Sequence, residues 1–182
     1  MLPNLKFPIG IFVEQNVVEL DRLIAKHNVK TVMEIGSFMG QAAGWFAQRV
    51  DHVYCIDRFE EPAAIPDGNN LVSWLRDYGL PTSFFDAFKY NLTEAGLWHK
   101  ITPIVGDSKL VSDLAPLVDL VYIDADHSYE GCTQDIRLYR SKAKMVLCGD
   151  DYIDRPGFGV IRAVTEALPV HKHSGQFWWF EL

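Results

Sequence analysis

Several sequence features are missing or scarce in this chain of 182 residues. It contains no run of lysines and arginines, and its net charge is −7, so we predict that it does not bind nucleic acid, which requires basic surfaces. No apolar stretch approaches the roughly 18 residues of a membrane-spanning helix. The first residues do not follow the pattern of a signal peptide either. We therefore predict no membrane association and a cytoplasmic location.

Cysteine is scarce as well. The three cysteines, Cys55, Cys132 and Cys148, form no Cys-x-x-Cys pair, and two of them lie inside apolar runs typical of strands. This spacing gives no sign of a disulfide framework. We predict that they are small core residues of a protein from a reducing compartment.

The glycine motifs that bind phosphate groups are also missing. The chain has neither Gly-x-x-x-x-Gly-Lys-Ser/Thr nor Gly-x-Gly-x-x-Gly, although an apolar run at 29–35 leads through Gly36 and Gly40 into a helical pattern. Glu34, near the end of that run, would repel a polyphosphate at the helix N-terminus. An acid suits a nucleoside with a cationic tail, such as S-adenosylmethionine.

What the chain does contain is a regular alternation of strand and helix patterns. Buried-strand patterns cover 29–35, 52–57, 101–105, 118–125, 144–148 and 176–182, and helical patterns cover 14–27, 41–50, 84–97, 129–140 and 160–168. This alternation predicts a single α/β domain over residues 1–182, with a Rossmann-like, doubly wound and mostly parallel sheet. The exception is the segment 58–83, which contains three prolines. We expect this segment to be a lid or a substrate loop.

Acids follow each of the first five predicted strands. They are Glu34, Asp57, Asp107 (followed by Ser108), Asp124 and the pair Asp150 and Asp151. One such acid is explained by helix capping, but open α/β sheets bind ligands outside the carboxyl ends of their strands. Five acidic strand ends in succession therefore predict a binding site at this edge. Asp57 is placed to accept hydrogen bonds from the hydroxyls of a ribose, and Asp107 is placed to accept one from the exocyclic amine of an adenine. Helix capping is the alternative role for both residues.

Five segments in this order carry a family resemblance. They are Val-Met-Glu-Ile-Gly-Ser-Phe-Met-Gly (32–40), Cys-Ile-Asp-Arg-Phe (55–59), Val-Gly-Asp-Ser (105–108), Leu-Val-Tyr-Ile-Asp-Ala-Asp-His-Ser-Tyr-Glu (120–130) and Leu-Cys-Gly-Asp-Asp-Tyr (147–152). Together they resemble class I S-adenosylmethionine-dependent methyltransferases, and most closely the small O-methyltransferase branch with catechol-type, caffeoyl-CoA-type and macrocin-type enzymes. The resemblance covers roughly residues 14–182. It implies a seven-stranded sheet with a sixth strand near 170–173 and an antiparallel last strand at 177–181. The chain departs from the commoner form of the family at Ser37, where a glycine is usual.

The resemblance also implies a cofactor site and a metal site. The cofactor, S-adenosylmethionine, would be held by Glu34, Gly36, Ser37, Gly40, Asp57, Arg58, Asp107, Ser108 and Asp124. The metal ligands would be Asp124, Asp150 and Asp151, with capping of the next helix as the alternative role of the last two. Ligands that offer only oxygen select a hard divalent cation, Mg²⁺ first.

His127 lies three residues beyond Asp124 and is predicted to take part in catalysis together with it. Methyl transfer to a hydroxyl requires removal of a proton, and the ordinary pKa of histidine suits a general base. In the catechol-type enzymes a lysine stands at about this place, so the role transfers by position only. We expect a small hydroxylated substrate, because the chain has no separate substrate domain.

Aromatic residues suggest walls for a substrate pocket and a contact between subunits. Phe59, Trp74, Tyr78, Phe84 and Phe85 are candidates for one wall, and Tyr152 with the segment 155–159 for another. Trp178 and Trp179 are neighbours on the last strand, where side chains alternate between faces. We expect one ring to be buried and the other exposed, as a candidate contact in a homodimer.

Three other functions stay open. The first is a methyltransferase that needs no metal and uses His127 as its base. The second is a nicotinamide-dependent dehydrogenase, which shares the sheet and the acid at Asp57 but not this glycine loop. The third is a binding or dimerising module without catalysis.

Overall fold

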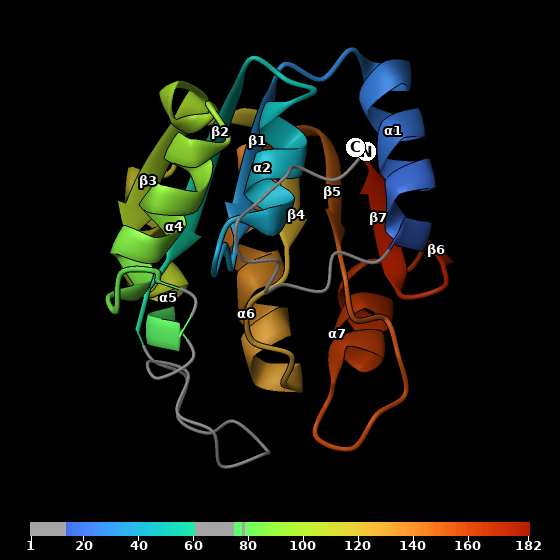
Figure 1. Ribbon diagram of the computed structural model, residues 1–182. Coiled ribbons are helices and arrows are strands. Elements are labelled where there is room, and N and C mark those ends of the chain that lie inside the picture. Colours follow the sequence, from blue (N-terminus) through green and yellow to red (C-terminus); the bar gives the residue numbers. More distant parts are fainter. Residues whose placement is uncertain (1–13, 61–74, 78) are drawn as a thin grey trace.

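The computed structural model describes residues 14–60, 75–77 and 79–182. Its centre is a seven-stranded sheet with the strand order β3-β2-β1-β4-β5-β7-β6 (Figure 1). The strands are β1 (Thr31–Ile35), β2 (His52–Asp57), β3 (Ile101–Val105), β4 (Val118–Ile123), β5 (Ala143–Gly149), β6 (Lys172–Ser174) and β7 (Phe177–Glu181). Strands β1 to β5 pair in parallel, and β7 runs antiparallel between β5 and β6. The predicted fold class, with its antiparallel last strand, is confirmed.

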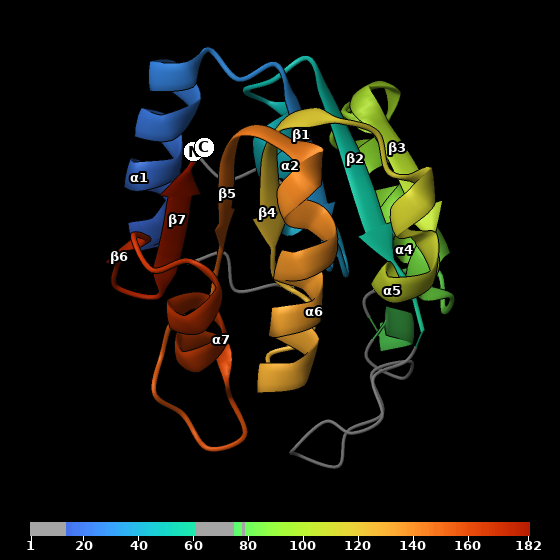
Figure 2. The same ribbon diagram turned by 180° about the vertical axis from the view of Figure 1, so that it is seen from behind.

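Helices cover both faces of the sheet. On one face lie α1 (Glu14–His27), α2 (Gln41–Ala47) and α4 (Phe84–Glu94), and on the other α5 (Ser108–Val111), α6 (Tyr129–Tyr139) and α7 (Val160–Ala167) (Figures 1 and 2). Short 3-10 helices occupy Trp98–Lys100, Ser112–Leu114 and Arg140–Lys142. Each face has its own apolar core. Leu20, Phe46 and Phe88 belong to the first, and Ile136 and Val164 belong to the second.

The helices that follow β3 and β4 begin with side-chain caps. Asp107 accepts a hydrogen bond from the backbone of Lys109 at 2.9 Å, and Ser128 accepts one from Gly131 at 3.0 Å. These caps satisfy backbone N–H groups that have no partner within the helix. The chain turns there at the carboxyl edge of the sheet, so the acids at the strand ends are brought to a common edge.

The expectation for the two neighbouring tryptophans is wrong. Trp178 and Trp179 do point to opposite faces, but both are buried, at 0% and 6% exposure. Trp179 packs in the core under α1, and Trp178 packs in the core that includes residues of α6 and α7. Helices cover both faces of β7, so alternation does not expose a ring here.

The cysteines are buried and free, as predicted. None of the described helices has the length and apolar character needed to cross a membrane. Most of the predicted lid or substrate loop, at 61–74 and 78, lies outside the described residues.

Candidate functional site

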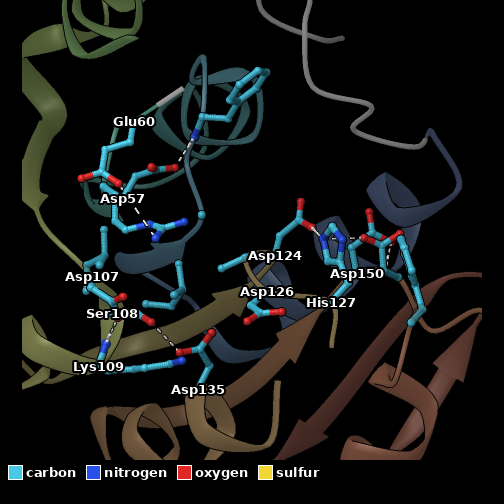
Figure 3. A pocket seen from close by; sticks show the side chains of 18 of the residues that line it. Asp57, Glu60, Asp107, Ser108, Lys109, Asp124, Asp126, His127, Asp135 and Asp150 are labelled. Carbon is cyan, nitrogen blue, oxygen red and sulfur yellow. Dashed lines mark hydrogen bonds and ion pairs between the residues drawn. The ribbon is translucent and has the colours of Figure 1, made fainter. Parts of the chain in front are cut away.

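A cavity of about 840 Å³ lies at the carboxyl edge of the sheet, where β1 to β5 end. Nine of the twelve predicted site residues line it: Gly36, Asp57, Arg58, Asp107, Ser108, Asp124, His127, Asp150 and Asp151. Among the side chains that Figure 3 labels, Asp107, Ser108 and Asp135 lie at one end of the cavity, and Asp124, His127 and Asp150 lie at the other (Figure 3).

The cavity is strongly acidic. Among the described residues, eight carboxylic acids line it: Asp57, Glu60, Asp107, Asp124, Asp126, Asp135, Asp150 and Asp151. The basic side chains in the wall are Arg58, Lys109, Arg155 and His127. Arg58 is mostly exposed and pairs with Glu60 at 3.9 Å. An excess of negative charge in a concave site favours a ligand that carries positive charge.

Three predicted cofactor residues, Glu34, Ser37 and Gly40, are not part of the cavity lining. Gly40 has a φ of +86° at the start of α2, and a Cβ there would meet the ring of Phe88 at 3.0 Å. The structure therefore gives Gly40 a packing role beneath the turn. Ser37 is buried, at 4% exposure.

Glu34 is 1% exposed, and its Oε2 has no hydrogen-bond partner among the described residues. Burial raises the pKa of Glu34 to about 8. The nearby Ser37 hydroxyl opposes this rise of the pKa, and the negative charges of Asp124 and Asp57 add to it. Glu34 is thus mostly protonated at neutral pH, which differs from the charged group expected from the sequence.

Gly36 makes the close approach between β1 and β4 possible. Its φ is +91°, and a Cβ at this position would lie 2.1 Å from the backbone oxygen of Asp124. Its amide donates to Ile56 O at 2.8 Å, while the Asp124 amide donates to Ile35 O at 2.8 Å. This glycine therefore brings the ends of β1, β2 and β4 together at the floor of the cavity.

Asp57 holds the loop that follows Gly36. One carboxylate oxygen accepts a hydrogen bond from the backbone of Phe38 at 2.8 Å, and the other accepts one from Phe59 at 2.7 Å. Each carboxylate oxygen can accept a second hydrogen bond. Asp57 therefore fixes the turn and still offers acceptors to a ligand.

Ser108 connects the β3 end of the cavity to α6. Its Oγ donates to Asp135 Oδ1 at 2.7 Å, and its backbone oxygen accepts from the hydroxyl of Tyr139 at 2.7 Å (Figure 3). Burial raises the pKa of Asp135 to about 6, and the Ser108 hydrogen bond opposes this rise. Our prediction missed Asp135, because it lies inside a helix and follows no strand end.

At the other end, His127 contacts two carboxylates. Its Nε2 lies 2.9 Å from Asp151 Oδ2 and 3.5 Å from Asp124 Oδ1. These two partners raise the pKa of His127 to about 10, against the effect of burial. Burial raises the pKa of Asp124, and His127 opposes that rise. Without another cation, His127 therefore carries the positive charge of this group.

One set of potential metal ligands appears among the described residues, and it differs from the predicted one. Asp124, His127 and Asp151 each offer a ligand atom, and these atoms lie within 4.8 Å of one another. Asp150 is outside this set, and its Oδ1 accepts a hydrogen bond from the Asp151 backbone at 2.8 Å. Burial raises the pKa of Asp150 to about 7, and Asp124 adds to this rise.

The segment after the acid pair lines the cavity in part, as expected. Arg155 and Phe158 belong to the lining, and the Phe158 ring lies 4.8 Å from that of His127. Tyr152 does not line the cavity. Phe84 packs in a separate apolar cluster and Phe85 against Phe59, so neither lines it. Trp74 and Tyr78 lie outside the described residues.

Comparisons with known proteins agree with this fold. A family model described as "Methyltransferase domain" matches residues 33–152. No curated protein matches the chain in sequence. Among solved structures, a methyltransferase from Geobacter sulfurreducens is similar with a TM-score of 0.64 at 18% identity, covering 96% of this chain and 83% of its own.

Two further solved structures contain a bound cofactor. The Bacillus cereus O-methyltransferase in complex with SAH has a TM-score of 0.63 at 12% identity, covering 94% of this chain and 82% of its own. TomG, an O-methyltransferase of Streptomyces achromogenes in complex with SAM, has a TM-score of 0.60 at 18% identity, covering 90% of this chain and 77% of its own. At these identities the likeness establishes the fold.

Proposed function

This chain belongs to the methyltransferase domain family, and from that premise we propose that it transfers a methyl group from S-adenosylmethionine to a hydroxyl of a small molecule, assisted by a divalent cation. The observation that carries the proposal is the acidic cavity, with the turn at Gly36 and Asp57 in one part of its wall and His127 in another. The O-methyltransferases with SAM or SAH bound that share this fold support the choice of cofactor and acceptor.

The cofactor fits the wall formed by β1, β2 and β3. Asp57 would accept the ribose hydroxyls, and Asp107 with Ser108 would face the base. The sulfonium and ammonium groups of the cofactor are both positive, which suits a cavity lined by eight acids. Glu34 and Ser37 would support this site from beneath the turn, because neither lines the cavity.

The reaction would take place at the His127 end. In methyl transfer, a bond forms between the acceptor oxygen and the methyl carbon while the carbon–sulfur bond breaks, and the hydroxyl proton must leave. A base has to lie within hydrogen-bond reach of that hydroxyl. His127 lines the cavity and is 37% exposed, so its ring is available to a substrate. The Phe158 ring beside it would restrict the orientation of the imidazole.

The charge of His127 is the reason to include a metal. As long as Asp124 and Asp151 hold it as an imidazolium, it has no free site for a proton. Asp124 and Asp151, with the neighbouring Asp150, would offer carboxylate oxygens, which suit Mg²⁺ or Mn²⁺, and would leave His127 free to act as the base. A divalent cation bound there would lower the pKa of a substrate hydroxyl. Neutralised carboxylates would also no longer raise the pKa of His127, which could then accept the proton.

The first test is calorimetric titration with S-adenosylhomocysteine, once with magnesium and once with EDTA. Binding in both solutions is the expected result. No binding in either would refute the methyltransferase proposal and favour a dehydrogenase or a non-catalytic module. NADH serves as the comparison ligand, and we expect it not to compete.

The second test measures the protons released when Mg²⁺ binds at pH 8, by calorimetry in buffers with different ionisation enthalpies. We expect release of up to one proton, because His127 loses the two charges that raise its pKa. His127→Gln should bind the metal with less proton release. If Mg²⁺ does not bind and EDTA leaves methyl transfer to a catechol or a similar acceptor unchanged, the metal is not needed. The function is then that of a metal-independent methyltransferase.

A further inference from the structure

Asp135 is a buried acid in the wall of the cavity, and the proposed chemistry does not use it. It lies on α6, is 1% exposed and lines the end of the cavity where β3 stops. Its Oδ1 accepts the hydrogen bond from Ser108 Oγ at 2.7 Å (Figure 3). A buried carboxylate is costly to maintain, so its position here calls for a function.

The hydrogen bond to Asp135 determines what Ser108 offers to a ligand. A hydroxyl has one proton and two lone pairs. Because the proton points to Asp135, the Ser108 oxygen can act only as an acceptor toward the cavity. Its neighbour Asp107 is also an acceptor when ionised, and it already holds the turn through Lys109 N at 2.9 Å.

Ser108 has little freedom to move away from this arrangement. Its backbone oxygen accepts from the hydroxyl of Tyr139 at 2.7 Å, so α6 holds both its main chain and its side chain. The orientation of the Ser108 hydroxyl therefore depends on the charge state of Asp135. An ionised carboxylate can only accept a hydrogen bond, whereas a protonated one can also donate.

We propose that Asp135 is a positioning residue which, by orienting the Ser108 hydroxyl, makes this end of the cavity select a base with an exocyclic amine over one with a carbonyl. The inference rests on the proposed function, since it requires the base of the cofactor to lie at Ser108. An amine donates to the acceptors Ser108 Oγ and Asp107. A carbonyl at the same place would face two acceptors and have no partner.

The charge on Asp135 changes in a measurable pH range. Burial raises its pKa to about 6. The nearby negative charges of Asp126 and Asp107 raise the pKa further, and Lys109 lowers it. Cys132 and Tyr139, on the same helix, have raised pKa values because of burial and stay neutral at these pH values. Below pH 6 the protonated carboxyl can donate to Ser108, which frees the hydroxyl proton for a carbonyl.

The test compares two ligands that differ only at the 6-position and the adjacent ring nitrogen of the base. S-adenosylhomocysteine has a 6-amino group, and S-inosylhomocysteine has a carbonyl in its place and a proton on the adjacent ring nitrogen. Their dissociation constants are measured by calorimetry from pH 5 to pH 7.5. The ratio of the two constants removes the effects of groups at the amino-acid end, which act on both ligands alike. At pH 7.5 we expect the adenosyl compound to bind at least about tenfold more tightly, and we expect the preference to shrink below pH 6.

Asp135→Asn is the main variant, because its amide can donate to Ser108 and reverse the hydrogen bond. We expect it to lower the preference by at least about threefold and to abolish the pH dependence of the ratio. Ser108→Ala should do the same, and Ser108→Thr should keep the wild-type ratio because it retains the hydroxyl. Asp113→Asn, an exposed acid that does not line the cavity, is the matched control. Thermal unfolding shows whether each variant is folded, and Ser108→Ala carries the test if Asp135→Asn is not.

The outcomes separate the inference from the proposed function. If the wild-type protein binds neither ligand, both are overturned. If it binds S-adenosylhomocysteine but the ratio and its pH profile are unchanged in Asp135→Asn and Ser108→Ala, only the inference is overturned. Asp135 would then support the fold without influencing ligand choice.

Discussion

Replacing Glu34 by glutamine should stabilise the protein, by an amount that depends on pH. Glu34 is 1% exposed and one of its oxygens has no hydrogen-bond partner among the described residues, so its ionised form is strongly disfavoured. The pKa rises from 4.5 to about 8. By linkage, this pKa shift lowers the free energy of unfolding by about 3 kcal/mol at pH 7 and by up to about 5 kcal/mol above pH 8.

The sign of the effect follows from the direction of the pKa shift. Below pH 4.5 Glu34 is protonated in both the folded and the unfolded protein, so glutamine brings no electrostatic gain. As the pH rises from 4.5 toward 8, Glu34 ionises in the unfolded chain but stays protonated in the folded protein, so the wild-type protein becomes less stable. Glutamine does not ionise, and its advantage grows over this range.

The assay is urea unfolding of the wild type and Glu34→Gln in EDTA at pH 4.5, 6, 7 and 8. The control is Glu94→Gln, which makes the same substitution at the exposed end of α4. Asp135 and Asp150 also titrate in this range, but they are common to both proteins. A difference between Glu34→Gln and wild type that stays constant from pH 4.5 to 8 would refute the reasoning.

Three further predictions concern the turn, the cofactor and the C-terminal strand. Gly36→Ala should cost about 2–5 kcal/mol of stability in urea unfolding, because a Cβ there clashes with the Asp124 backbone and alanine disfavours the positive φ. The control is Gly157→Ala, where φ is +85° but the space around the residue is open. This variant should lose only the smaller contribution, that of the unfavourable φ. Asp57→Asn should weaken S-adenosylhomocysteine binding about tenfold or more by calorimetry, and unchanged affinity would remove Asp57 from the cofactor site. Glu181→Gln should cost about 1 kcal/mol at pH 7, because Glu181 accepts from Lys26, His27 and Lys172 on the surface. Those contacts lower the pKa of Glu181 from 4.5 to about 2. The loss of stability in the variant should therefore be full above pH 4.5 and disappear as the pH falls toward 2. A loss of stability that persists at pH 2 would contradict this account.

Periodicity in the sequence was sufficient for most of the fold. The predicted bounds of the helix at 14–27 and of the strands at 52–57 and 101–105 agree with the structure. The bounds of the last strand at 177–181, which the family resemblance implied, agree as well. Periodicity did not predict α5 (Ser108–Val111), because four residues are too few for a helical repeat to appear. The burial of both tryptophans was missed for another reason, since it depends on which helices cover β7 in the folded protein.

The site was predictable as far as it depends on strand ends. Asp57, Asp107 and Asp124 follow parallel strands, and parallel strands end at one edge. Asp135 was missed because only the packing of α6 against α5 brings it to Ser108. Asp150 and Asp151 are adjacent, but only Asp151 belongs to the set of potential metal ligands with Asp124 and His127, a difference that no spacing rule reveals.

The pKa values of acids at the two edges of the sheet shift in opposite directions. Burial would raise the pKa of Asp119, at the amino edge, but hydrogen bonds from the backbone of Lys30 and Thr31 lower it. Burial raises the pKa of Glu34, Asp124, Asp135 and Asp150 at the carboxyl edge, so their charges destabilise the free protein at neutral pH. A cationic ligand in the cavity would offset that cost only in the bound state. Asp124 and Asp150, which line the cavity, would in this way contribute to the affinity for a cationic ligand.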